Sequence, residues 1–136
     1  MLDKLAFMAE PAQSLAVYLH LARASDLRRQ PLVTDKLLVL AGTVALELAF
    51  VDIADQCHAA VLQRNPQHLI RHWPSLTEAI AASRFQAFLK QLRRQYSHEK
   101  AEHMLGSLGI EMARERDLYA NDHEYASALL EAVLRR

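Results

Sequence analysis

Residues 98–103, with the sequence HEKAEH, bring together side chains that could bind a metal or transfer protons. Their spacing comes close to two zinc-binding helix motifs, HExxH and HxxEH, in which two histidines share one face of a helix. Glu102 stands where the first motif requires its second histidine, and Glu99 stands where the second motif requires its first. What remains is His98 with Glu102 and Glu99 with His103, and such pairs stabilise an exposed helix by about 0.2–0.5 kcal/mol each. We therefore predict a helix surface here rather than a metal site.

His68 and His72 are also four residues apart and could supply two ligands to a metal ion. The sequence identifies no third ligand for them, and Pro66 and Pro74 restrict the helix in between. We interpret the two histidines as a surface or hinge pair beside Trp73. The sequence also has no glycine-rich phosphate loop, nucleophile elbow or cysteine pair. It therefore favours a protein without catalytic residues, bound metal or cofactor.

Arg93 and His98 have the R-x4-H spacing of HEPN-type ribonucleases, which are small helical proteins, and the stretch resembles that motif. The resemblance implies that the basic residue holds a phosphate while the histidine transfers a proton. It departs from the family in having Arg94 directly after Arg93, where a polar residue is typical. Lys90 and Lys100 extend a local basic group that could contact phosphates or an acidic peptide. The alternative functional hypothesis is therefore a ribonuclease or RNA-binding role for Lys90, Arg93, Arg94 and His98.

The charge balance of this 136-residue chain limits its partners, because it has 16 lysines and arginines and 16 aspartates and glutamates. With zero net charge there is no overall field to attract nucleic acid or an acidic membrane, so a solvated helix face is favoured for the basic group. No uncharged run approaches the roughly 20 residues that span a bilayer. Asp3, Lys4 and Glu10 interrupt the beginning of the chain, unlike in a signal peptide. We expect a cytoplasmic protein that does not bind membranes.

Composition points to one helical domain. Hydrophobic residues make up 51% of the chain, which is enough to form a core, and we expect a single domain over residues 1–136. Only 3 glycines and 4 prolines are available for tight turns, and no long run alternates polar and apolar residues. The sequence therefore predicts an all-α fold. The one cysteine, Cys57, fits a reducing compartment and is interpreted as a buried core residue.

Short patterns predict where the helices begin and end. A first helical region is expected over residues 2–23, with Pro11 at the start of its main segment. Short helices are expected over residues 67–73 and 111–119, and Gly109 is expected to end the helix that begins after Ser97. The residues expected to cap helix N-termini are Thr34, Ser75, Ser83, Ser97 and Asn121. One stripe, interpreted as core rather than as a surface for stacking bases, consists of Phe85, Phe88, Leu89, Leu92 and Tyr96.

Residues 34–66 are predicted to form two helices that fold back on each other. Apolar residues recur at three- and four-residue steps in each half. Asn65 and Pro66 end the second helix, since the residue before a proline avoids helical geometry. Gly42 lies inside the first helix, where glycine costs about 1 kcal/mol relative to alanine. Either another helix approaches closely at this position, or the glycine is simply tolerated.

The spacing of small residues in this stretch resembles one tetratricopeptide-type helical hairpin. The sequence departs from the family at Ala45 and His58, where aromatic residues are usual. A step of 34 residues in either direction from Gly42 finds no second copy of the hairpin. The matching positions are Leu38, Ala41, Gly42, Ala49, Ala54 and Pro66.

The resemblance implies stacked antiparallel hairpins, arranged as an α–α superhelix or as a compact helical bundle. It also implies a non-catalytic adaptor whose groove, lined by the first helix of the hairpin, binds a peptide or a helix of another protein. Because one hairpin cannot bury its apolar faces alone, pairing with a second copy of the chain is a further expectation. The residues expected to line the groove are Lys36, Val39, Thr43 and Glu47.

Overall fold

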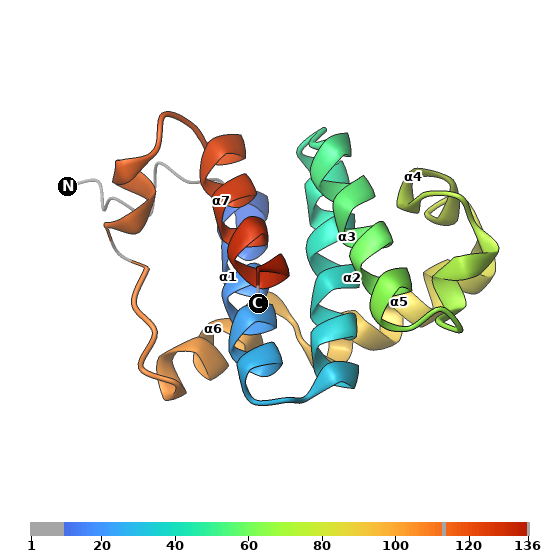
Figure 1. The fold of residues 1–136 in the computed structure, drawn as a ribbon, viewed down its shortest axis with the longest axis horizontal. Helices are drawn as coiled ribbons and strands as arrows, with labels where there is room; N and C mark the ends of the chain where they lie inside the picture. The colour runs from blue at the N-terminus through green and yellow to red at the C-terminus, as the bar shows by residue number, and fades with distance from the viewer. Residues whose placement is uncertain (1–9, 113, 136) are drawn as a thin grey trace.

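The structure is a computed structural model that describes residues 10–112 and 114–135, and it confirms the predicted all-α fold class. Figure 1 shows the course of the chain, and no strand occurs in its described part. None of the described helices is long and apolar enough to cross a membrane. The elements are α1 (Glu10–Leu27), α2 (Pro31–Glu47), α3 (Val51–Arg64), the 3-10 helix η2 (Leu69–His72), α4 (Leu76–Ala79), α5 (Ser83–Gln95), α6 (His98–Ser107), the 3-10 helix η3 (Glu115–Leu118) and α7 (Asp122–Leu134).

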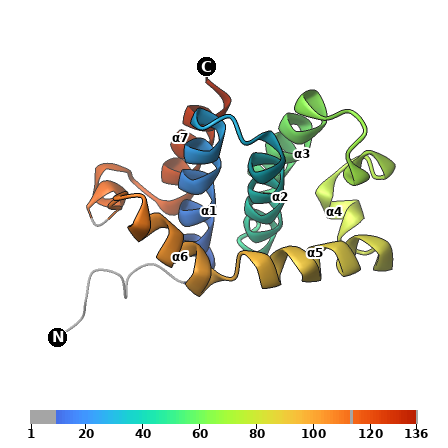
Figure 2. The ribbon, with the colours of Figure 1, turned by 90° about the horizontal axis from the view of Figure 1, so that it is seen from below.

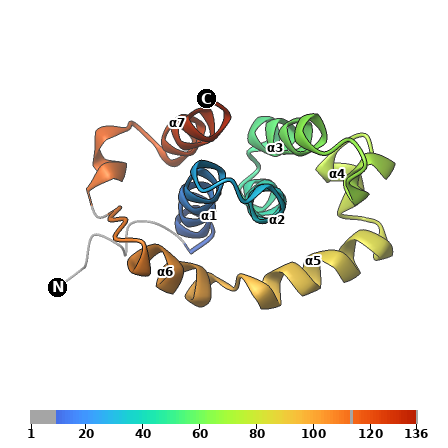
Figure 3. The same cartoon turned by 60° about the horizontal axis from the view of Figure 1, so that its bottom comes forward.

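The helices form three layers, which Figure 3 shows from the edge. α1 and α2 lie side by side in the middle layer, and the contact between them is the most extensive of any pair of elements. α3 and α7 cover one side of this pair, while α5 and α6 run one after the other across the opposite side. The two central helices therefore have neighbours on both sides.

The amino-acid content of α2 explains its central position. The run from Leu37 to Leu46 has no charged residue. Every residue from Leu37 to Thr43 is buried, and seven consecutive residues cover the whole circumference of an α-helix. A helix that is apolar on all sides is stable only inside the protein, so other helices must surround α2.

α5 is an outer helix with one buried side. Its buried residues Phe85, Leu89 and Leu92 recur at three- and four-residue steps, and the buried Tyr96 follows at the end of the helix. Phe88 is partly buried and packs against the same core. The interpretation of this stripe as core is therefore confirmed, and the remaining side of α5 faces solvent.

Three of the predicted caps are confirmed. In each, a side-chain oxygen accepts a hydrogen bond from the backbone N–H three residues later, which satisfies one of the free donors of the first turn. The prediction for Ser83 is wrong, since Ala82 is the residue that precedes α5. The confirmed pairs are Ser75 with Glu78, Ser97 with Lys100, and Asn121 with Glu124.

The predicted cap at Thr34 is also wrong, because α2 begins one turn earlier, at Pro31. Proline suits the first helical position, since its missing N–H is one that would have no partner there. Thr34 is buried inside the helix, where its hydroxyl donates to the carbonyl of Gln30 at 3.1 Å. The same hydroxyl lies 2.7 Å from Ser25 Oγ, and this contact ties the beginning of α2 to the end of α1.

Three helices end with a residue in the left-handed conformation. Gly109 has a φ of 72° and follows α6, which confirms the predicted stop. Arg29 and Ala49 adopt φ values of 59° and 61° after α1 and α2. Beyond Ala49, the N–H of Phe50 donates to the carbonyl of Ala45 at 2.8 Å, a Schellman motif that reverses the chain into α3. The predicted hairpin of α2 and α3, with its turn at Ala49, is therefore present.

Gly42 lies where α2 packs closely against both α3 and α4. A Cβ atom at this position would be 2.3 Å from Leu76 Cδ1 and 3.1 Å from Cys57 Cβ, both closer than normal contact. This geometry favours close approach over a merely tolerated glycine. Burial also raises the pKa of the Cys57 thiol to about 12, so the side chain acts as a small apolar residue.

Two predicted helical regions differ from the structure in extent. The described part of the first begins at Glu10, and residues 2–9 of that prediction lie outside the described residues. Among its described residues, the second region, expected over residues 111–119, contains only the short 3-10 helix η3. η3 is held by side chains of α7 and α1: the Tyr125 hydroxyl donates to Glu115 Oε1 at 2.8 Å, and His20 Nε2 lies 2.9 Å from the same oxygen. These tertiary contacts, and not helix propensity, fix this segment.

Candidate functional sites: the α3–α7 groove and the α5 basic face

The groove predicted on α2 is closed in the folded protein. Val39 is 0% exposed and Thr43 is 1% exposed, so neither can contact a partner. Lys36 is partly buried, and the exposed Glu47 lies 3.7 Å from Arg93 of α5. The predicted groove residues must therefore be corrected. The physical reason is that α5 crosses this side of α2, as Figure 2 shows, where a solenoid hairpin would have left it open.

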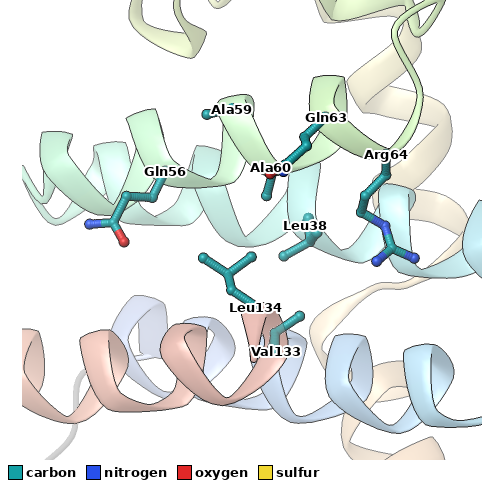
Figure 4. Close-up of a pocket in the computed structure, with 8 residues that line it drawn as sticks. All are labelled: Leu38, Gln56, Ala59, Ala60, Gln63, Arg64, Val133 and Leu134. Carbon is teal, nitrogen blue, oxygen red and sulfur yellow. The ribbon is translucent and has the colours of Figure 1, made fainter. Parts of the chain in front are cut away.

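A groove does exist between α3 and α7, with α2 at its base. It is a pocket of about 400 Å³, and Figure 4 shows side chains from α3 and α7 facing each other across it. We call this feature the α3–α7 groove, and it is lined by Leu38, Gln56, Ala59, Ala60, Gln63, Arg64, Val133 and Leu134.

The two walls of the α3–α7 groove run in the same direction and are joined near their N-termini. At their N-termini, His123 Nε2 lies 2.8 Å from Asp52 Oδ2, and the His123 ring meets the Phe50 ring edge-on at 4.9 Å. The hydrogen bond from His123 lowers the pKa of Asp52. Towards their C-termini, Arg64 and Leu134 line the same pocket. The groove is therefore an open channel between parallel helices.

The groove is mainly apolar, with the neutral Gln56 and Gln63 along its rim and the cationic Arg64 at one end. Ala59 and Ala60 have short side chains, which leaves space between the helices that longer residues would fill. Leu134 is 46% exposed at the edge of the groove, and the carboxamides of Gln56 and Gln63 offer hydrogen bonds. The sequence did not indicate this site, because its walls come from segments about 70 residues apart and no local pattern pairs them.

Arg64 at the end of the groove belongs to a buried cluster of charges. Its guanidinium Nη1 lies 3.0 Å from Asp26 Oδ1, and its Nε lies 3.4 Å from Asp35 Oδ1. The second contact is an ion pair without hydrogen-bond geometry, and within the described structure neither of its two atoms has another hydrogen-bond partner. Burial raises the pKa of Asp35, while the charge of Arg64 opposes that rise. The cluster connects the ends of three helices.

Three residues of the predicted RNA site lie together on α5. Lys90, Arg93 and Arg94 are exposed, and with Gln86 and Ala87 they line a surface depression of about 520 Å³. We call the exposed side of this helix the α5 basic face, and its cations are Arg84, Lys90, Arg93 and Arg94.

His98, the fourth residue of that predicted site, is occupied by structural contacts. Its Nδ1 lies 2.5 Å from Ser14 Oγ, and its Nε2 lies 2.6 Å from Glu102 Oε1. The residue types match a Ser–His–carboxylate triad, but Ser14 is 7% exposed and lies inside α1. Backbone N–H groups inside a helix are bonded within the helix and cannot form an oxyanion hole. We interpret the three residues as a structural hydrogen-bond network that joins α1 to α6.

The pair of His68 and His72 is not arranged as a metal site. His68 Nδ1 accepts the N–H of Ile70 at 3.2 Å, which caps η2, whereas His72 is exposed. Within residues 10–112 and 114–135, no cluster of three or more His, Cys, Asp or Glu side chains could hold a metal ion. A different histidine holds this loop to α3: the ring of the buried His58 bonds through Nε2 to the carbonyl of Trp73 at 2.8 Å.

His68 is expected to make folding sensitive to mild acid. Burial lowers its pKa below the usual 6.5, so the folded state favours the neutral ring whereas the unfolded state takes up a proton near that pH. Stability from His68 is therefore complete above about pH 6.5 and is lost as the pH falls through the lower folded pKa. His68→Asn should keep the cap, because asparagine is a favoured N-cap residue, and should make the loss of stability below about pH 6.5 smaller.

Urea unfolding of the parent and of the His68→Asn variant, at about pH 7.5 and about pH 5.5, measures this difference. The exposed His72 provides a comparison, because its pKa is also lowered, by desolvation and by the nearby charges of Arg71 and Arg84. Since solvent screens an exposed side chain, His72→Asn should reduce the pH dependence less than His68→Asn does. If lowering the pH decreases the free energy of unfolding equally in the parent and in His68→Asn, His68 is not the source of the acid sensitivity.

Comparison of the chain with protein-family models, with curated proteins and with solved structures finds no match in any of the three. The tetratricopeptide-like and HEPN-like interpretations therefore stay predictions. Two features of the described structure on which a function can be based are the α3–α7 groove and the α5 basic face.

Proposed function

We propose that this protein is a non-catalytic interaction module that binds a short amphipathic helix of another protein in the α3–α7 groove. The observation that carries the proposal is the groove itself. The buried Leu38, Ala60 and Val133 form its floor, and the accessible surface is supplied by Gln56, Ala59 and Gln63 of α3 and by the partly exposed Leu134 of α7. Apolar surface of this kind is what a partner helix needs for its anchor residues.

The shape of the groove favours a helical partner. Two parallel helices leave a channel along their common direction, and an amphipathic helix can lay one apolar stripe into such a channel with anchors at i, i+3, i+4 and i+7. The rim residues Gln56 and Gln63 are neutral, and the charge of Arg64 is already opposed by Asp26 and Asp35. The expected partner therefore has small or medium apolar anchors and uncharged polar residues beside them.

The resemblance of residues 34–66 to a tetratricopeptide hairpin supports the same class of function. In that family the first helix of each hairpin lines the groove, whereas here the accessible surface belongs to α3, the second helix. The proposed partner is therefore the one that the resemblance implies, a helix of another protein, but it binds along α3 instead of α2.

Selection from a phage-displayed library of random peptides, long enough to form several helical turns, tests the proposal. Enriched sequences should carry an apolar stripe with helical spacing and should become helical on binding. Ala59→Lys places a long cationic side chain in the groove and should weaken binding of the enriched peptides at least about tenfold. Asp55→Lys, at an exposed position of the same helix that does not line the groove, should bind them as tightly as the parent.

Equal affinity for the parent and the Ala59→Lys variant would contradict the proposed groove, as would enrichment of peptides without helical spacing. Sedimentation of the parent shows whether the chain is a monomer or pairs with a second copy of itself. A dimer that Ala59→Lys dissociates would make the second copy, and not a different protein, the occupant of the groove.

A further inference from the structure

The zero net charge of the chain hides a strong local segregation of charge on α5. The 13 residues of this helix include Arg84, Lys90, Arg93 and Arg94 but no aspartate or glutamate. All four cations are exposed. Arg84, Gln91 and Arg94 lie on one stripe at helical spacing, with Lys90 beside it, and the stripe spans about 15 Å along the helix. Phosphates of a nucleic-acid strand could contact several of these cations at once.

The rest of the α5 basic face is polar and contains no apolar anchor. Its other exposed side chains are Ser83, Gln86, Ala87, Gln91 and Gln95. The large hydrophobic side chains that are exposed in the described structure lie elsewhere: Leu27, Leu32, Val51, Leu118 and Leu134. Protein partners usually depend on a few buried aromatic or apolar anchors, whereas a phosphate backbone requires cations and hydrogen-bond donors. The composition of this face therefore fits a phosphate backbone better than a protein.

Side chains next to α5 favour the binding of a nucleic acid at one end of the helix and oppose it at the other. Near its beginning, the partly buried Trp73 packs edge-on against Phe85 at 5.8 Å, next to the exposed His72. Such rings offer a surface on which unpaired bases can stack. Near its end, Glu47 lies 3.7 Å from Arg93 and competes with any phosphate for that side chain.

We infer that the α5 basic face binds the phosphate backbone of single-stranded RNA. The charges hold the strand along α5, and the rings near its beginning accept a base. This surface is separate from the α3–α7 groove, which lies on the opposite side of the central α1–α2 layer (Figure 3). The two binding activities can therefore succeed or fail independently, and Ala59→Lys in the groove should bind RNA like the parent.

Fluorescence anisotropy with a labelled single-stranded RNA of about 12 nucleotides tests the inference on the whole chain. Up to four phosphate contacts predict that the logarithm of the binding constant falls with the logarithm of the salt concentration with a slope of about −2.8. This slope corresponds to a loss of affinity of about 50-fold between 50 and 200 mM salt. The double variant Lys90→Glu/Arg94→Glu should bind at least about tenfold more weakly, because two contacts become repulsive. Glu47→Gln, which frees Arg93, should bind about two- to fivefold more tightly.

Arg28→Glu/Arg29→Glu is the matched control, because it changes the net charge equally at exposed positions in the loop at the opposite end of α2 from Glu47. It should retain most of the affinity of the parent. A loss equal to that of Lys90→Glu/Arg94→Glu would overturn the inference, since only net charge would then matter. Absence of binding by the parent at low salt, or equally tight binding of a poly-glutamate peptide of the same length, would also overturn it. Circular dichroism of each variant confirms that it is folded.

Discussion

Replacing Arg64 with methionine is expected to lower the free energy of unfolding by about 3–5 kcal/mol at neutral pH. The side chain of Asp35 is 4% exposed, and Arg64 supplies the cation nearest to its Oδ1. Methionine fills a similar volume but leaves the carboxylate buried without this charge. The free-energy cost of an uncompensated buried charge exceeds the stabilisation from the apolar surface of methionine. Urea unfolding followed by circular dichroism measures the difference.

The pH dependence of this loss tests its electrostatic origin. Because the folded pKa of Asp35 is raised, protonation favours the folded state, and stability is lost as the pH rises through that pKa. Without Arg64 the folded pKa should rise further, so the deficit of Arg64→Met relative to the parent should shrink as the pH is lowered towards about 4. The double variant Asp35→Asn/Arg64→Met should recover at least half of the loss at neutral pH. A deficit below about 1 kcal/mol, or one that does not change with pH, would refute the charge cluster.

Gly42→Ala is expected to lower the free energy of unfolding by about 1–3 kcal/mol, although alanine is the better helix former. The new methyl group would lie 2.3 Å from Leu76 Cδ1 and 3.1 Å from Cys57 Cβ. The leucine side chain is fully buried and has little room to adopt another rotamer, and the cysteine Cβ is fixed to the α3 backbone. α2 and α3 must therefore separate slightly. Chemical denaturation of parent and variant gives the change.

Gly106→Ala is the matched control for Gly42→Ala. A Cβ atom at Gly106 would have nothing within 4 Å, so the substitution should raise stability by about 0.5–1 kcal/mol through helix propensity alone. The same chemical change should thus have opposite signs at the two glycines. In addition, Leu76→Ala should cost less in the Gly42→Ala background than in the parent, because it removes the closest atom. If both glycine variants are stabilised, the close approach of α2 and α3 does not occur.

Local patterns in the sequence determined the helices and most of their ends. Ser75, Ser97 and Asn121 cap helices, and Gly109 stops one, because these residues act on backbone groups within a few positions of themselves. Failures arose where two local signals competed. Thr34 could have capped a helix, but proline three residues earlier suits the first helical position and started α2 there instead.

Tertiary structure alone decided which surfaces are open. The apolar circumference of α2 shows from the sequence that neighbours must surround it, but not that α5 is the helix that closes the side carrying Val39 and Thr43. The α3–α7 groove and the pairing of Asp35 with Arg64 depend on side chains that meet only when distant segments pack. Helix periodicity fixes which face of a helix is buried, whereas the identity of the facing helix depends on the free energy of the whole packed core. For that reason the sequence predicted the fold class and the core of this protein, and the tertiary structure located its binding surfaces.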